Sequence, residues 1–175
     1  MKHTRIMQRI NGLFRAKLLG LVNNITVEKN VLIGPNKYFV LNEGSLSIHE
    51  GVRIRDCFRC VLDGGSIVIS QGTFLNSGVS LNSRIEITIG KYCHIGPNVS
   101  FFDHDHKFGK NININSSGFS NKAIKVGENV WIGANVAVLK GVNIGSNCVV
   151  AAGITVRDSI PDGHILLESG LVPLR

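Results

Sequence analysis

The strongest constraint on this chain is an aliphatic side chain that returns at every sixth position between residues 126 and 160. A second apolar row follows four positions behind the first. The two rows are Val126, Ile132, Val138, Ile144, Val150 and Val156, and Val130, Val136, Val142, Cys148, Ile154 and Ile160. An amphipathic helix repeats at about 3.6 residues and a simple strand at about two, so neither element explains this period. The period is typical of a hexapeptide β-helix.

Elementary geometry describes the coil. Six extended residues span about 20 Å, and three such sides make a coil of about 18 residues that stacks on the next at strand spacing. The columns are then Val126 beneath Ile144, Ile132 beneath Val150, and Val138 beneath Val156. The spacing does not set the handedness of this solenoid, because it is compatible with either hand of crossover.

The same period runs in broken phases from Ile25 to Phe101. We expect roughly four irregular coils before two regular ones, with an insertion around Asp63-Gly64-Gly65 and a bulged corner near Ser83 and Arg84. Between the two groups, residues 102–123 lack hexads, so they form an extruded loop. A long excursion from a compact repeat is usually functional.

Composition narrows the class of protein. The chain of 175 residues suits one domain, and 43% apolar with 18% charged residues indicates an ordinary folded protein. A net charge of +7 favours an acidic partner, such as a phosphate-bearing cofactor, a polyanionic saccharide or an anionic membrane. Nucleic acid is disfavoured because the basic residues are dispersed and no recognition motif accompanies them. Four cysteines without a secretory signal indicate free thiols in a reducing, cytoplasmic setting.

Residues 1–24 form a separate N-terminal segment ahead of a β-helix domain at 25–175. Basic residues interrupt its apolar run, which argues against a signal peptide and a membrane span. Helical spacing indicates an amphipathic helix, with the apolar residues Ile6, Ile10, Leu13, Phe14, Leu18 and Leu21. This helix either caps the first coil or makes peripheral contact with the anionic inner membrane surface.

The most reactive-looking side chains are in the run from Phe101 to Lys107, which contains Asp-His-Asp-His. A neutral imidazole can accept a proton near neutral pH, and an adjacent carboxylate can orient it. From spacing alone, the two histidines fit a solvated loop first, a general base second and a metal site least. Cys57 and Cys60 form a C-x-x-C without a second pair, which favours packed thiols over zinc.

The stretch from Val126 to Asn147 resembles the left-handed β-helix acyltransferases, most closely the maltose and galactoside O-acetyltransferases and their polysaccharide-modifying relatives. The resemblance implies an all-β solenoid, a left-handed parallel β-helix, working as a homotrimer. It also implies acetyl coenzyme A as acyl donor, with no metal required, and a saccharide hydroxyl as acceptor. That acceptor would belong to a cell-surface polysaccharide, such as a capsule, O-antigen or exopolysaccharide, or to its precursor.

Site residues follow from the same resemblance. The run from Ile89 to His106 is similar to the family segment that ends in the catalytic histidine, which places the general base at His106. Asn76 matches an asparagine that contacts acceptor and reaction centre. Trp131 matches the Asn-Val-Trp-Ile-Gly motif at the active-site cleft, although core packing is its ordinary interpretation.

The coenzyme region departs from the family pattern. Backbone amides around Ala134 and Ala152 match positions that hold pantetheine and the thioester. The position of the usual phosphate-binding lysine is Asp158, so Arg157 or Lys140 is expected to supply that charge. Two alternatives stay open: N-acylation of an amino sugar, and a β-helix scaffold or binding protein without turnover.

Overall fold

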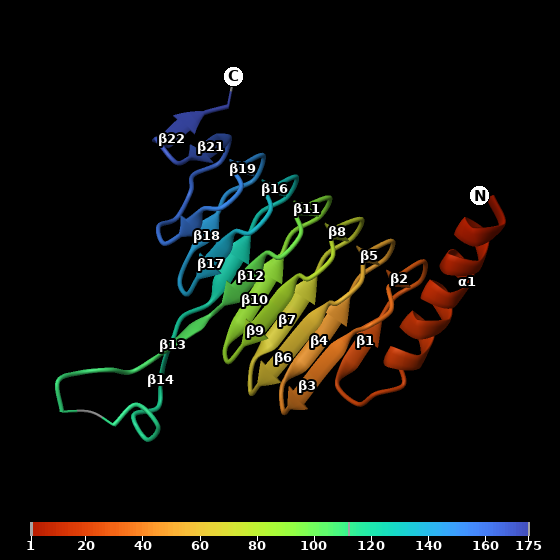
Figure 1. Ribbon diagram of the computed structural model, residues 1–175, viewed down its shortest axis with the longest axis horizontal. Coiled ribbons are helices and arrows are strands. Elements are labelled where there is room, and N and C mark those ends of the chain that lie inside the picture. Colours follow the sequence, from red (N-terminus) through yellow and green to blue (C-terminus); the bar gives the residue numbers. More distant parts are fainter. Residues whose placement is uncertain (1, 112, 175) are drawn as a thin grey trace.

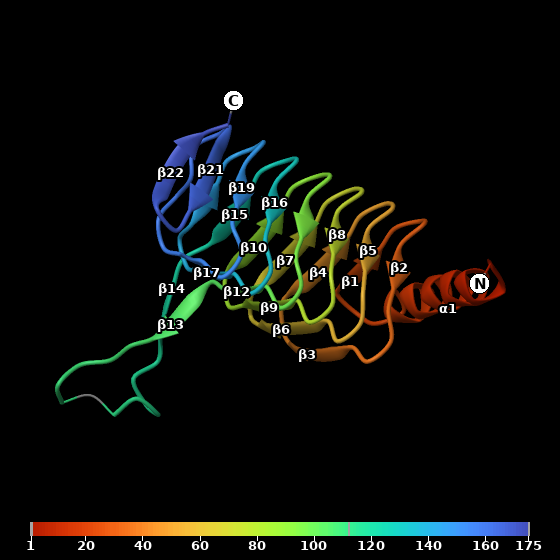
Figure 2. The ribbon, with the colours of Figure 1, turned by 45° about the horizontal axis from the view of Figure 1, so that its top comes forward.

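The computed structural model describes residues 2–111 and 113–174, and it forms a parallel β-helix of about six coils with one helix at its first end (Figure 1). Each coil contributes one strand to each of three sheets, here called A, B and C. The coils stack along the long axis of the molecule, and Figure 2 shows them turning around a common interior. This architecture confirms the expected hexapeptide β-helix and is consistent with its left-handed form.

The strands are short because each crosses only one side of a coil. Sheet A contains β1 (Ile25–Val27), β4 (Ser45–Ile48), β7 (Ser66–Ile69), β10 (Glu86–Ile89), β15 (Ile124–Val126) and β18 (Asn143–Ile144). Sheet B contains β2 (Leu32–Ile33), β5 (Arg53–Ile54), β8 (Phe74–Leu75), β11 (His94–Ile95), β16 (Trp131–Ile132), β19 (Val149–Val150), β21 (His164–Leu167) and β22 (Gly170–Pro173). Sheet C contains β3 (Tyr38–Asn42), β6 (Arg59–Asp63), β9 (Ser80–Ser83), β12 (Ser100–Phe102), β17 (Ala137–Leu139) and β20 (Thr155–Val156).

The interior is a set of aliphatic columns in register. The three expected columns are confirmed, because the strand pairs join Val126 to Ile144, Ile132 to Val150 and Val138 to Val156. Phe101 continues the sheet C column and is fully buried. Alternation of buried and exposed residues along each strand keeps polar side chains outside.

Coil length explains the broken phases. In the regular part Val126 pairs with Ile144, 18 residues on, whereas Leu46 pairs with Ile67, 21 residues on. The extra residues lengthen sheet C, where β3 and β6 have five residues each. Left-handed backbone at the corners accounts for many asparagines, since Asn98, Asn135 and Asn147 all have a φ of 57°.

Helix α1 (Lys2–Leu19) lies across the first end of the stack, beside β1 and β2 (Figure 1). Its buried residues are Gly12, Ala16 and Leu19. Ile10, Leu13, Phe14, Leu18 and Leu21 are exposed and do not seal the first coil, although the helix itself covers that end as one of the two alternatives expected. The side chain of Ile6, named with them, lies outside the described residues. No helix in residues 2–111 and 113–174 is long and apolar enough to cross a membrane.

The expected excursion at residues 102–123 has a defined base. Strands β13 (His104–His106) and β14 (Phe119–Asn121) pair antiparallel and leave the fourth coil at the C–A edge, where sheet C turns into sheet A. The hairpin projects away from the prism (Figure 2). At the other end of the molecule, β22 pairs antiparallel with β21 and ends sheet B.

Candidate functional site

A fully buried carboxylate, Asp103, organises the base of the hairpin. Its Oδ1 accepts a hydrogen bond from the backbone N–H of Arg84 at 2.8 Å, and its Oδ2 accepts from the N–H groups of Ile85 at 2.8 Å and Glu86 at 3.0 Å. The Ser83 hydroxyl lies 2.8 Å from Oδ2. These donors satisfy a charge that would otherwise be costly to bury. The bulged corner expected near Ser83 and Arg84 is therefore closed by a side chain from the next coil.

The same carboxylate orients one of the two histidines. Nδ1 of His104 lies 3.0 Å from Oδ1 of Asp103, and the His104 side chain is 20% exposed. Donation from Nδ1–H to the carboxylate leaves Nε2 able to accept a proton. His106 is exposed, and its ring lies 4.5 Å from that of Phe119 between centroids. Among the described residues His106 has no carboxylate partner.

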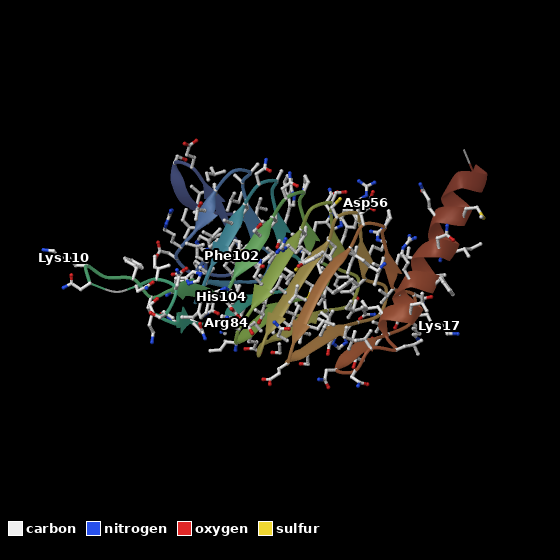
Figure 3. The ribbon with its side chains drawn as sticks, turned by 60° about the horizontal axis from the view of Figure 1, so that its bottom comes forward. Lys17, Asp56, Arg84, Phe102, His104 and Lys110 are labelled. Carbon is white, nitrogen blue, oxygen red and sulfur yellow. The ribbon has the colours of Figure 1, made fainter. Side chains whose placement is uncertain are left out.

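Two basic side chains hold the hairpin against the prism. The guanidinium of Arg84 lies 3.7 Å from the centre of the Phe119 ring and forms an ion pair with Asp63. Nζ of Lys140 lies 3.0 Å from Oδ2 of Asp105 and 2.8 Å from Oγ of Ser120. Figure 3 shows Arg84, His104 and Phe102 gathered where the hairpin leaves the coils, with Lys110 at its far end. Lys140 is thus engaged at the hairpin base, which leaves Arg157 as the exposed basic residue of the two candidates.

A row of aromatic and basic side chains lines the outside of sheet B. Arg53 stands 5.3 Å from the Phe74 ring centroid, Phe74 and His94 are 5.5 Å apart, and Trp131 pairs with His94 in the strand register. Trp131 is 59% exposed, so the core-packing interpretation of this residue is wrong. A hollow of ≈ 340 Å³ is lined by Tyr92, His94, Asn129, Val130 and Trp131.

The expected site residues fall on different parts of one prism. The expected base His106, with His104 beside it in β13, and Lys140 lie at the C–A edge, and Arg157 follows β20 at the same edge. Asn76, Ala134 and Ala152 lie at the B–C edge, where sheet B turns into sheet C. One side of a coil, about 20 Å long, separates these two edges. A single protomer therefore does not bring the histidines together with Asn76 and Ala134.

The B–C edge has features of a ligand-binding strip. Oδ1 of Asn76 accepts a hydrogen bond from the backbone N–H of Ser77 at 2.9 Å and another from Nη1 of Arg55 at 3.4 Å. These contacts are those of an ordinary corner asparagine. Ala152 is exposed and Ala134 half-buried. Within the described part of the chain, neither alanine's backbone N–H donates to a protein acceptor. These two donors are open to a ligand that follows the edge.

Sequence reasoning missed several residues that shape this site. The sequence indicated a carboxylate beside a histidine, but it did not indicate that Asp103 binds the corner at Ser83. That contact joins two consecutive coils, so its partners lie far apart in the sequence. Nor did the sequence indicate the contact of Arg84 with Phe119. A signal was present in the sequence: Asp103 lies two positions after the apolar-row residue Phe101, as Ser83 lies two positions after Leu81 in the previous coil.

The cysteines and metal ligands add no second reaction centre. Among residues 2–111 and 113–174 no three His, Cys, Asp or Glu side chains gather in a way that could hold a metal ion. Cys57 is exposed, while Cys60, Cys93 and Cys148 are buried. Burial raises the pKa of the Cys60 thiol to about 12 and also raises that of Cys93. Both buried thiols stay protonated at neutral pH.

Comparisons with known proteins agree with the fold. Residues 123–157 match a family model described as the hexapeptide repeat of succinyl-transferase. No curated protein matches the sequence significantly.

Solved structures resemble the whole solenoid. A hexapeptide-repeat acetyltransferase from Vibrio cholerae O1 biovar eltor, crystallised with acetyl coenzyme A, is 24% identical over 95% of this chain and 87% of its own, with a TM-score of 0.59. AntD, an N-acyltransferase from Bacillus cereus in complex with dTDP and 3-hydroxybutyryl-CoA, is 20% identical over 92% of this chain and 87% of its own, with a TM-score of 0.72. NeuO, a polySia-specific acetyltransferase, is 19% identical over 87% of this chain and 88% of its own, with a TM-score of 0.56. These likenesses define the fold as a hexapeptide-repeat β-helix.

Proposed function

We propose that this chain is an acyltransferase that uses acetyl coenzyme A to acetylate a saccharide hydroxyl, in a cell-surface polysaccharide or its precursor, within the cytoplasm. The single observation that carries the proposal is the contact of His104 with the buried Asp103, at the base of a hairpin that leaves the β-helix. Three structures of similar fold, named as acetyl- or acyltransferases, add support.

The general base of this proposal is His104. Sequence matching favours His106, but only His104 has a carboxylate that selects the tautomer with a free Nε2. An oriented imidazole contributes typically about 100-fold to 10,000-fold to proton transfer. His106, on the same face of β13 and stacked on Phe119, is then a wall of the acceptor site.

The reaction is a single acyl transfer. Nε2 of His104 takes the proton from the acceptor hydroxyl as its oxygen bonds to the thioester carbonyl carbon. The carbon–sulfur bond then breaks, the acetyl ester remains on the saccharide, and coenzyme A leaves as the thiol with that proton. Backbone N–H donors at the cleft are suited to hold the negative oxygen of the tetrahedral intermediate.

Coenzyme A would lie along the B–C edge, where the free N–H groups of Ala134 and Ala152 can bond to the amides of its pantetheine arm. Arg157 is the basic side chain proposed for its phosphates. Because Arg157 and the histidines lie at the C–A edge while Ala134 lies at the B–C edge, the complete cleft needs edges from two subunits. A homotrimer, with Asn76 facing the acceptor and Trp131 lining the cleft, meets that requirement.

The test measures thiol release from acetyl coenzyme A with a panel of hydroxyl sugars and amino sugars. We expect hydroxyl sugars to be turned over, His104→Ala to lose about 100-fold to 10,000-fold in rate, and His106→Ala to lose far less. His49→Ala, which alters a histidine paired with Glu28 at a distant edge, is the matched control. If His106→Ala alone abolishes turnover, the base belongs to His106.

A second candidate function is N-acylation of an amino sugar, favoured by the TM-score of 0.72 to AntD. Amino sugars would then release thiol faster than hydroxyl sugars, and the loss in His104→Ala would be smaller because a neutral amine needs less base assistance. A chain without turnover on any acceptor would instead act as a β-helix scaffold.

A further inference from the structure

Helix α1 presents two unlike sides. The side against the first coil carries small or short contacts: Gly12 and Ala16 are buried, and a methyl at Gly12 would lie 3.5 Å from the carbonyl oxygen of Ile33. Nε of Arg15 donates to that same oxygen at 2.7 Å. The helix therefore docks through these small residues and the buried Leu19, and its other bulky apolar residues are not needed to close the first coil.

Those bulky residues form the opposite side of the helix. Ile10, Phe14 and Leu18 follow one another at four-residue spacing and therefore share a face. They are 54%, 61% and 49% exposed. Met7 and Leu21 are exposed as well. We call Met7, Ile10, Phe14 and Leu18 the outer face of α1; Leu21 lies in the turn just after the helix.

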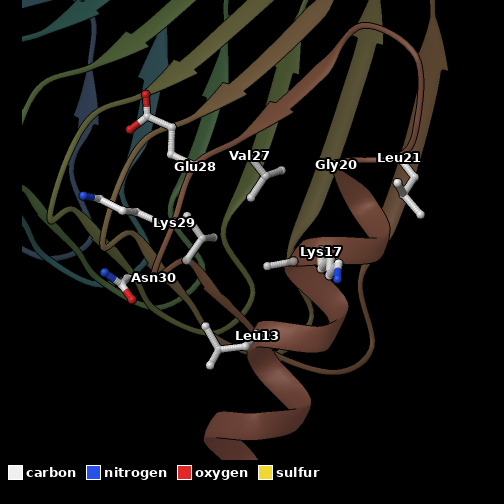
Figure 4. A pocket seen from close by; sticks show the side chains of 10 residues that line it. Leu13, Lys17, Gly20, Leu21, Val27, Glu28, Lys29 and Asn30 are labelled. Carbon is white, nitrogen blue, oxygen red and sulfur yellow. The ribbon is translucent and has the colours of Figure 1, made fainter.

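A shallow groove continues the outer face toward the prism (Figure 4). It lies between α1 and the first coil, has a volume of ≈ 400 Å³, and includes the apolar side chains of Leu13, Leu21 and Val27. Lys17 and Lys29 stand at its rim beside Glu28, whose carboxylate is engaged by the His49 ring and by the backbone N–H of Glu50. Apolar side chains bordered by ammonium groups suit a surface that is itself apolar inside and negatively charged outside.

The helix and the strand that follows it carry charge of one sign as far as Val27, and the first acidic residue is Glu28. Residues 1–27 contain five Lys or Arg residues and no Asp or Glu, within a chain of net charge +7. Arg9 and Lys17 are exposed on α1, and each precedes a residue of the outer face by one position. A second copy of α1 would meet this face with the same positive charge, whereas an anionic bilayer would complement it.

We propose that the outer face of α1 docks this protein on an anionic lipid bilayer, with α1 lying in the interface plane and not crossing it. The apolar side chains enter the headgroup–acyl boundary while Arg9 and Lys17 contact lipid phosphates. The coil stack then stands away from the membrane. The hairpin leaves the fourth coil, about 15 Å beyond the first at strand spacing. Docking of this kind is independent of whether the chain transfers acyl groups.

The experiment is sedimentation of the full chain with vesicles of phosphatidylglycerol and phosphatidylcholine, and with vesicles of phosphatidylcholine alone. We expect binding to the anionic vesicles that falls steeply when salt rises from about 0.05 M to about 1 M, where screening shortens to about 3 Å. Phe14→Ser with Leu18→Ser should weaken binding at least tenfold. Arg9→Gln with Lys17→Gln should weaken it about fivefold per residue.

Matched controls use equal changes elsewhere. Leu171→Ser with Leu174→Ser removes two exposed leucines from the opposite end of the molecule, and Lys110→Gln with Lys122→Gln removes two exposed charges in and after the hairpin, away from α1. Both should bind vesicles like the unchanged protein. Because Phe14 and Leu18 are exposed, their loss should leave the melting temperature within about 2 °C.

Three results would overturn the proposal. Absence of binding to anionic vesicles is one, and an equal loss of binding in the controls is another. The third is a fall in particle mass by light scattering in the Phe14→Ser, Leu18→Ser variant with unchanged vesicle binding, which would assign the outer face to a second copy of this chain.

Discussion

Oδ1 of Asp103 lies 3.0 Å from Nδ1 of His104, and the other oxygen of the same carboxylate accepts from the backbone of the preceding coil. One buried charge therefore both closes a corner of the β-helix and orients a histidine on the hairpin. Folding and chemistry share this residue, so changes to it should affect stability and activity together.

Asp103→Asn tests that double role. The side-chain amide introduced by Asp103→Asn would have to turn its NH₂ group toward either the Arg84 N–H or the N–H groups of the Ser83 corner. In both orientations an NH₂ donor then faces a backbone N–H donor, and a hydrogen bond is lost. We expect the free energy of unfolding to fall by about 1.5–3 kcal/mol, the range for hydrogen bonds to charged groups. If the NH₂ donates to Nδ1, Nε2 is protonated and no longer acts as a base, so turnover should drop by about 100-fold to 10,000-fold.

Asp105→Asn is the control for Asp103→Asn, because it removes a carboxylate two residues away that pairs with Lys140 and contacts no histidine in the hydrogen-bond network. It should keep its activity within a few-fold. Unfolding in urea and thiol release measure the two effects. Full activity in Asp103→Asn would refute the orienting role of this carboxylate.

Lys140 and Arg157 should separate into a structural and a binding role. Lys140→Gln loses the contacts with Asp105 and Ser120, so the hairpin should open more often and trypsin should cut faster after Lys107 or Lys110. The cost in global stability should be at most about 1 kcal/mol, because the pair is partly exposed. Lys125→Gln, which breaks a looser 3.8 Å pair with Glu86, is the control and should leave cleavage unchanged.

Arg157→Ala should instead raise the Michaelis constant for acetyl coenzyme A and leave the rate at saturation nearly unchanged, since a phosphate contact is made equally in ground and transition states. Steady-state kinetics with varied acetyl coenzyme A measure this. A larger rise in Lys140→Gln than in Arg157→Ala would reverse the assignment.

The solenoid could be predicted from the sequence because the same packing environment recurs in every coil. Val126 and Ile144 are local copies of one environment, so spacing alone places them in a column. Helix α1 illustrates the limit. Hydrophobic periodicity located the helix, but which side docks depends on shape: small Gly12 and Ala16 face the first coil together with Leu19, and most of the bulky apolar residues remain outside.

The candidate site was only partly predictable for a related reason. Motif resemblance led to the hairpin histidines and to Trp131, whose local sequence is distinctive. The choice between His104 and His106 depends on Asp103, and the environment of Asp103 depends on the register between β9 and β12, which short-range patterns do not contain.

The cysteines make a prediction about reactivity and pH. One thiol, Cys57, should react quickly with a disulfide reagent in the native protein, and Cys57→Ser should remove that reaction. Cys60 should react only after unfolding, because burial raises its pKa to about 12. Rapid reaction of two or more thiols would show that the interior of the coils opens readily.

The sign of the pH effect follows from the same pKa. An exposed thiol in the unfolded chain ionises near its ordinary value of 9.0, below the folded value for Cys60. The unfolded state therefore loses its proton first, and the stability contributed by the neutral buried thiol falls as pH rises from about 9 toward 12. Cys60→Ala should flatten this decline in urea unfolding measured against pH, after allowance for its lower starting stability.

Trp131 offers the sharpest test of a cleft between subunits, because it is the sole tryptophan and is 59% exposed in one protomer. If the aromatic row on sheet B is covered by a neighbouring subunit, the native emission should be blue-shifted from that of a solvated indole. Acetyl coenzyme A should alter it further by binding beside the ring.

The emission of Trp131 should move to the red when the assembly is diluted or dissociated, in step with a fall in mass by light scattering. His94→Ala, a change next to Trp131 in register, should shift the spectrum, whereas Lys37→Gln should not. A monomeric mass together with the emission of a fully exposed indole would contradict a two-subunit active site.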